Sequence, residues 1–203
     1  MNVSRGLLDG METTALNTAL SEATCLGVEV DTANAQLSLD LEVLTLPAEG
    51  PAPEDHRVKL TFTGVSRVAA SLRIQEWDDV AARVLPLQLD KLDAAIRSFG
   101  GGRLHGWEFI DVDDSGWVHW SELLSFDTRI DAHDATHVIE FSQEEGIDPR
   151  ELDVRVWFDD MTIHDAKGAA IPLKEFIAGG VRWWKAHDAG DPRTMRAGIV
   201  PQL

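Results

Sequence analysis

The sequence predicts one α+β domain of mostly antiparallel strands, about eight in number, with two or three helices that cover a sheet. Three observations support this prediction: apolar and polar residues alternate in several segments, two segments have helical apolar spacing, and turn-forming residues separate the strands. A chain of 203 residues is long enough for one well-formed core. We therefore expect a single domain over residues 1–187 and a loosely attached C-terminal tail over 188–203, which is rich in Gly, Pro and Arg.

The first predicted strands, 25–30 and 36–46, flank the sequence DTANA, whose composition is typical of a hairpin turn. A Pro-rich loop follows at 47–55 and leads into alternating residues at 58–63. Later segments of the same kind are 104–112, 124–131 and 152–159. Each of these strands is expected to have one face in the core and the other face in water.

Two helices are predicted, at 87–99 and 172–187. The first places four apolar residues on one side and ends at a run of three glycines. The second gathers its apolar residues within an arc of roughly 160°. Because glycine destabilises a helix, we attribute Gly179 and Gly180 to close packing on the sheet. A shorter helix is expected at 12–20.

The chain has a formal net charge of −17, and residues 108–165 contain 17 acidic residues against three arginines. Nucleic acids and anionic membranes bind basic surfaces, so neither is expected as a partner. Three interpretations of the acidic region stay open: a solvated surface or adaptation to salt, a divalent-cation site, or a docking surface for a basic protein.

The sequence contains no run of 18 apolar residues and no apolar segment of a secretory signal near its first residue. Its single cysteine, Cys25, cannot form an internal disulfide and has no basic neighbour that would activate the thiol. These features favour a cytoplasmic location and a core position for Cys25.

Residues 111–122, DVDDSGWVHWSE, have the residue pattern of an EF-hand calcium loop. Asp111, Asp113 and Ser115 occupy positions 1, 3 and 5 of that loop, and Glu122 occupies position 12. Calcium is a hard cation that takes six to eight oxygen ligands. The resemblance covers twelve residues and implies calcium coordination by Asp111, Asp113, Ser115 and Glu122. No other cofactor is expected.

The flanks of this loop favour a different interpretation. An EF-hand loop lies between two helices, whereas the residues on both sides of 111–122 alternate as in strands. The favoured structure is a β-hairpin in which strand 104–112 turns through 113–116 and returns through 117–120. Calcium binding within such a hairpin is an alternative.

The sequence contains no nucleophile elbow, P-loop or dinucleotide-binding fingerprint. The segment 131–137, DAHDATH, has turn composition and is expected to be a polar loop. A hydrolase-type enzyme would therefore need carboxylates and histidines that only the fold brings together. Its candidate histidines are His105, His119, His133, His137 and His164.

The favoured hypothesis is a non-catalytic intracellular binding protein whose acidic 108–165 region meets a basic partner. Trp117 and Trp120 lie within this region, beside several acidic residues. They form the candidate contact patch, together with Asp113, Asp114 and Asp134.

Overall fold

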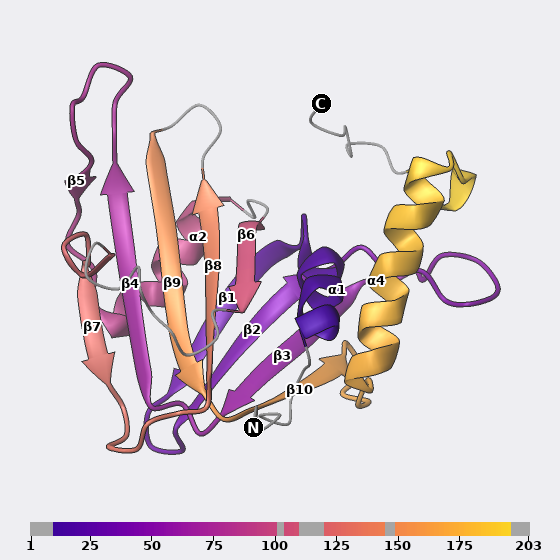
Figure 1. Cartoon of the computed structure of the whole chain (residues 1–203), viewed down its shortest axis with the longest axis horizontal. Coiled ribbons are helices and arrows are strands. Elements are labelled where there is room, and N and C mark those ends of the chain that lie inside the picture. The colour runs from indigo at the N-terminus through magenta and orange to yellow at the C-terminus, as the bar shows by residue number, and fades with distance from the viewer. Residues whose placement is uncertain (1–9, 101–103, 110–119, 145–148, 196–203) are drawn as a thin grey trace.

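The computed structural model of the chain describes residues 10–100, 104–109, 120–144 and 149–195 (Figure 1). Its strands are all paired antiparallel and form two sheets, accompanied by three α-helices, which confirms the predicted α+β class. The helices are α1 (Gly10–Leu20), α2 (Leu92–Ser98) and α4 (Leu173–Asp188), with short 3₁₀ helices at Leu89–Lys91 and Pro192–Thr194.

The smaller sheet has the order β1-β2-β3-β10, with β1 at Thr24–Asp31, β2 at Gln36–Glu42, β3 at Arg57–Thr63 and β10 at Asp160–Asp165. The predicted hairpin between β1 and β2 is confirmed, although β2 ends four residues earlier than expected. Asp31 shapes its turn, because one carboxylate oxygen accepts the backbone N–H groups of Ala33 and Asn34, both at 3.1 Å.

The larger sheet has the order β5-β4-β9-β8-β6, and β7 also pairs with β4. Its strands are β4 (Arg67–Ile74), β5 (Arg83–Val84), β6 (Leu104–Phe109), β7 (Phe126–Arg129), β8 (His137–Glu144) and β9 (Arg150–Phe158). The predicted strands at 104–112, 124–131 and 152–159 correspond to β6, β7 and β9.

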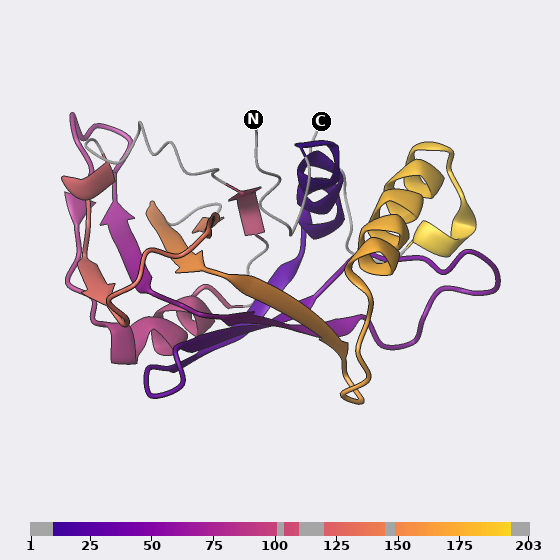
Figure 2. The ribbon, with the colours of Figure 1, turned by 60° about the horizontal axis from the view of Figure 1, so that its bottom comes forward.

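The two sheets join where two strands pass from one into the other. β3 continues into β4 and β9 continues into β10, so that Thr63 pairs with Asp160 and Arg67 pairs with Trp157. Three residues on one side of this junction face two on the other, which is the arrangement of a β-bulge that bends the sheet. The result is one strongly curved surface with α1 and α4 on the same side (Figure 2).

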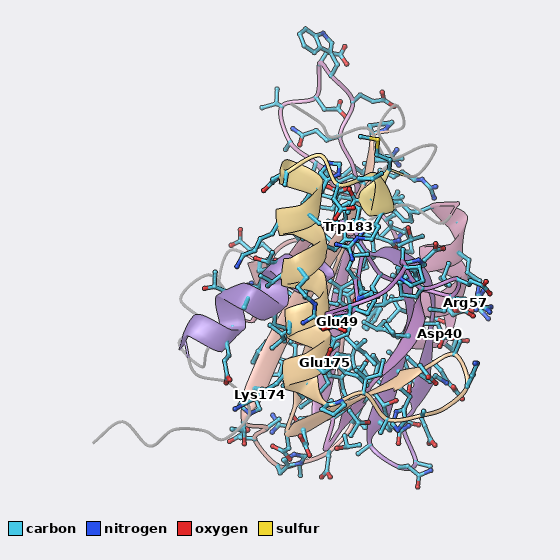
Figure 3. All side chains as sticks on the ribbon, turned by 90° about the vertical axis from the view of Figure 1, so that its right-hand side faces the viewer. Asp40, Glu49, Arg57, Lys174, Glu175 and Trp183 are labelled. Atoms are coloured by element: carbon cyan, nitrogen blue, oxygen red, sulfur yellow. The ribbon has the colours of Figure 1, made fainter. Side chains whose placement is uncertain are left out.

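The predicted helix at 172–187 is confirmed as α4, and the one at 12–20 as α1. Phe176, Ile177 and Trp183 of α4 are buried, whereas Lys174 and Glu175 in its first turn are exposed (Figure 3). The predicted helix at 87–99 is shorter, because its start forms a 3₁₀ turn before α2.

Gly179 and Gly180 of α4 do not pack on the sheet as predicted; they face α1 and the β2–β3 connection. A Cβ on Gly180 would lie 2.5 Å from both Cα and Cβ of Ala19, which belongs to α1. A Cβ on Gly179 would lie 2.4 Å from Oγ1 of Thr45, in the β2–β3 connection. Close approach of α4 to α1 therefore requires Gly180, whereas Gly179 faces only a side-chain hydroxyl of the connecting segment that can rotate.

The residues after α4 return toward the β2–β3 connection. Thr194 is buried, and the guanidinium of Arg193 donates a hydrogen bond to the carbonyl of Gly50 at 3.2 Å. Residues 196–203 of the predicted tail lie outside the described part of the chain.

Candidate functional site

Three of the four predicted calcium ligands, Asp111, Asp113 and Ser115, lie outside the described residues. The fourth, Glu122, is exposed at the start of the segment that leads into β7. In the part of the chain that the structure describes, no group of three or more His, Cys, Asp or Glu side chains could hold a metal ion. The calcium loop stays a prediction. The predicted hairpin is wrong at the end of its return strand, because Trp120 is helical, and its turn lies outside the described residues.

The polar face of the larger sheet contains buried ion pairs. Arg73 of β4 lies between two carboxylates of β9, with N–O distances of 2.6 Å to Asp153 and 2.6 Å to Glu151. The side chains of Arg73 and Asp153 are only 11% and 10% exposed. The prediction that this face of β9 meets water is therefore wrong for Asp153. Strand register places Arg73 directly opposite Glu151, and Ser71 opposite Asp153, so charges distant in sequence neutralise each other.

A second ion pair joins the buried Arg155 of β9 to the half-buried Glu140 of β8. The ring of Trp120 lies over the Arg155 guanidinium, 4.3 Å from its centre, and forms a cation–π contact. Trp120 is 9% exposed, so it cannot belong to an exposed contact patch as predicted. Trp117, Asp113 and Asp114 lie outside the described residues.

Asp134, the remaining member of the predicted patch, is fully exposed and pairs with Arg129 at 3.0 Å. Trp120 thus has a structural role here. The described residues thus include one buried member of the predicted patch, Trp120, and one exposed member, Asp134.

Burial raises the pKa of Asp153 to about 6, and the nearby Glu151 carboxylate adds to the rise, while Arg73 partly opposes it. A raised carboxyl pKa is common in catalytic sites. Here, however, the neighbouring Ser71 hydroxyl donates to the carbonyl of Leu123 at 2.5 Å and accepts from Arg73 at 2.9 Å. Arg73 thus binds Asp153, Glu151 and Ser71 at once, which fits a structural ion-pair network.

Three of the five candidate histidines have described side chains, and these three lie in different settings. Nε2 of His133 is 2.9 Å from Asp159, and Nδ1 is 3.4 Å from Asp131. Thr136 donates both its backbone N–H and its hydroxyl to the second oxygen of Asp159, so this cluster orders the loop before β8. Burial raises the pKa of Asp159, but the bonds from Thr136 and His133 outweigh it and lower the pKa below its ordinary value.

His137 is buried and packs against the ring of Phe158, while the side chains of His105 and His119 are not described. His164 lines a groove of about 550 Å³ on the smaller sheet. Asp40 and Arg57, which are labelled in Figure 3, also line this groove. The three Lys and Arg side chains of this groove already pair with carboxylates: Arg57 with Asp55, Lys59 with Glu29 and Arg97 with Asp93. This balance of charge gives the groove no preference for an anion.

The β4–β5 connection, residues 75–82, projects beyond the ends of the strands (Figure 1). Trp77 and Val80 are fully exposed on it, at 100% and 102% of their reference areas. Glu76, Asp78 and Asp79 are exposed beside them. An apolar pair ringed by carboxylates differs from the scattered apolar residues that any protein surface carries.

A polar cleft of about 380 Å³ separates this connection from the neighbouring ends of β8 and β9. Glu76 and Trp77 line one side, and Glu144, Glu151 and Arg150 line the other. Arg150 is engaged elsewhere, because it donates to Ser98 and lies over the Phe99 ring. The cleft therefore presents three carboxylates, of which only Glu151 pairs with a described cation.

We call Glu76, Asp78, Asp79 and Glu144 the acidic end of the larger sheet. None of these four carboxylates forms an ion pair with a residue in the described ranges. The first three were not predicted from the sequence because they lie outside the acid-rich 108–165 segment. A tryptophan flanked by acids in QEWDD was the available signal.

No family model, curated protein or solved structure matches this chain. Among the described helices, none is long and apolar enough to span a membrane. The function is therefore argued from the geometry of the chain itself.

Proposed function

We propose that this protein is a non-catalytic binding protein that presents the acidic end of the larger sheet to a basic protein partner. One observation carries the proposal. Four exposed carboxylates, on two neighbouring parts of the fold, lack a described counter-charge, whereas the buried Asp153 and the half-buried Glu140 are paired with arginines. The proposed surface thus moves from the predicted Trp120 region to residues 76–79 and Glu144.

Such a surface mainly affects how fast a partner associates and which partner is chosen, and it adds little to the affinity. An exposed ion pair contributes only about 0.2–1 kcal/mol, because water and salt screen it. Several like charges in one place nevertheless steer an oppositely charged partner and raise the association rate at low salt. The proposal includes a cytoplasmic location, which the lone, buried Cys25 supports.

A display library of random 16-residue peptides tests the proposal even though the partner is unidentified. Peptides selected on the wild-type protein should be enriched in Arg and Lys. Their affinity should fall at least tenfold on a variant with Glu76→Lys, Asp78→Lys and Glu144→Lys. The same variant carries Asp79→Asn in place of a lysine. The Asp79 carboxylate accepts the Glu76 backbone N–H at 3.0 Å and shapes the loop, and the amide oxygen of Asn can accept the same bond.

The matched control carries Glu49→Lys and Glu54→Lys, two exposed acids in the β2–β3 connection on the opposite side of the molecule (Figure 1). It should bind the selected peptides as the wild type does. Selected peptides without excess basic residues, or equal loss of affinity in both variants, would contradict the proposal.

A further inference from the structure

We infer that Trp77 and Val80 are the apolar anchor of this interaction and insert into an apolar pocket on the basic partner. The inference rests on the proposed function and adds the contact that supplies affinity, since exposed charges alone supply little. Tryptophan is one of the residue types enriched among the few interface residues that dominate binding. Its large ring buries much area while only two side-chain torsions become fixed.

The exposure of these two residues is exceptional within the described chain. The only other large apolar side chain that is strongly exposed in the described ranges is Met195, at 72%. The other tryptophans with described side chains, Trp120, Trp157, Trp183 and Trp184, are buried or half-buried. Trp77 and Val80 gain nothing from the fold in their present position, so core packing does not explain them.

Hydrogen bonds within the chain define the conformation of the loop that carries them. The backbone N–H of Asp79 donates to the carbonyl of Glu76 at 3.0 Å, and the Glu76 N–H donates to the Asp79 carboxylate at 3.0 Å. Gln75 donates its backbone N–H to Pro149 at 3.1 Å, which ties the loop to the start of β9. A preformed loop loses less conformational entropy on binding than a flexible one.

The charges around the anchor select the kind of partner. Glu76, Asp78 and Asp79 surround Trp77 and Val80, so an anionic membrane surface would be repelled. A second copy of this chain would meet like charges if it used the same surface. A protein with basic residues around an apolar pocket satisfies both the apolar and the charged groups, and the acidic cleft beside Trp77 can receive one of its basic side chains.

The test uses peptides selected on the full-length wild-type protein. Trp77→Ala should lower their affinity at least tenfold, mainly by faster dissociation, and Trp77→Phe should restore part of it. Val80→Ala should have a smaller effect in the same direction. Met195→Ala, a change at another exposed apolar residue, should have none. Because Trp77 is fully exposed, its variants should melt at the wild-type temperature.

The other outcomes separate this inference from the proposed function. If the lysine variants lose affinity but Trp77→Ala does not, the anchor is wrong and the acidic surface stands. If neither change matters, or if no peptide is selected, both ideas fail. Binding of the wild type to phosphatidylcholine vesicles, or dimerisation in sedimentation, that Trp77→Ala abolishes would show that a membrane or a second copy occupies the anchor instead.

Discussion

Replacement of Gly180 by alanine tests the contact between α1 and α4. The added Cβ would lie 2.5 Å from Cα and Cβ of Ala19 and 3.3 Å from its carbonyl oxygen. Carbon atoms in contact are normally about 3.5–4.0 Å apart, so the helices must separate by about 1 Å at this point. The obstructing atoms include helix backbone, which cannot rotate away.

The net effect is a balance of two opposing terms. Overpacking of this kind typically costs about 1–3 kcal/mol, and the backbone contact places Gly180→Ala near the upper end. Alanine favours a helix over glycine by about 1 kcal/mol. We therefore expect a net loss of about 2 kcal/mol in the free energy of unfolding, which for a chain of this length lowers Tm by roughly 4–8 °C.

Gly179→Ala is the matched control, because it gives the same gain in helix propensity. Its Cβ would meet Thr45 Oγ1 at 2.4 Å, but that hydroxyl can rotate, and the next atoms lie at 3.6 and 3.7 Å. Its stability should stay within about 1 kcal/mol of the wild type. Urea unfolding followed by circular dichroism measures both variants. A Gly180→Ala protein as stable as the wild type, or less affected than Gly179→Ala, would refute the proposed helix contact.

Three further predictions concern single groups. The pKa of Asp153 in the fold, about 6, exceeds its ordinary value near 4. Its contribution to stability is therefore present below about pH 4 and is lost as pH rises through about 6. Between these pH values the urea midpoint of the wild type should fall relative to that of Asp153→Asn, and a constant difference between the two midpoints would contradict this. Burial raises the pKa of the Cys25 thiol to about 12, so an aromatic disulfide reagent at pH 8 should react only after unfolding, and rapid native labelling would count against a buried thiol. We expect 2 mM calcium to leave the Tm of chelator-treated protein unchanged; a calcium-specific rise that Glu122→Gln removes would instead favour the calcium loop.

Period-two alternation predicted strands well where one face of the sheet meets water. β3 is the best example, because Val58, Leu60 and Phe62 are buried and alternate with more exposed residues. Alternation did not predict β4, whose residues Val68 to Arg73 are all buried. Both faces of β4 are covered, so its sequence shows no alternation, and only the tertiary structure explains the strand.

The buried ion pairs were beyond prediction for a related reason. Arg73 and Asp153 are 80 positions apart, and only the register between β4 and β9 brings them together. Seen in sequence, Asp153 and Arg155 are ordinary polar members of an alternating strand. Trp120 covers Arg155 from a segment outside the sheet, which the alternation of β9 could not reveal.

The fold divides the acidic residues into two groups that net charge alone cannot separate. Asp153 and Glu140 neutralise buried arginines, so replacing them should mainly affect stability. The acidic end of the larger sheet has no described counter-charge, so replacing it should mainly affect binding. A surface that served solubility alone would account for the free carboxylates, but it would have no need of a fully exposed tryptophan held among them by an ordered loop. Trp77, more than the charge, therefore favours a binding surface over a merely soluble one.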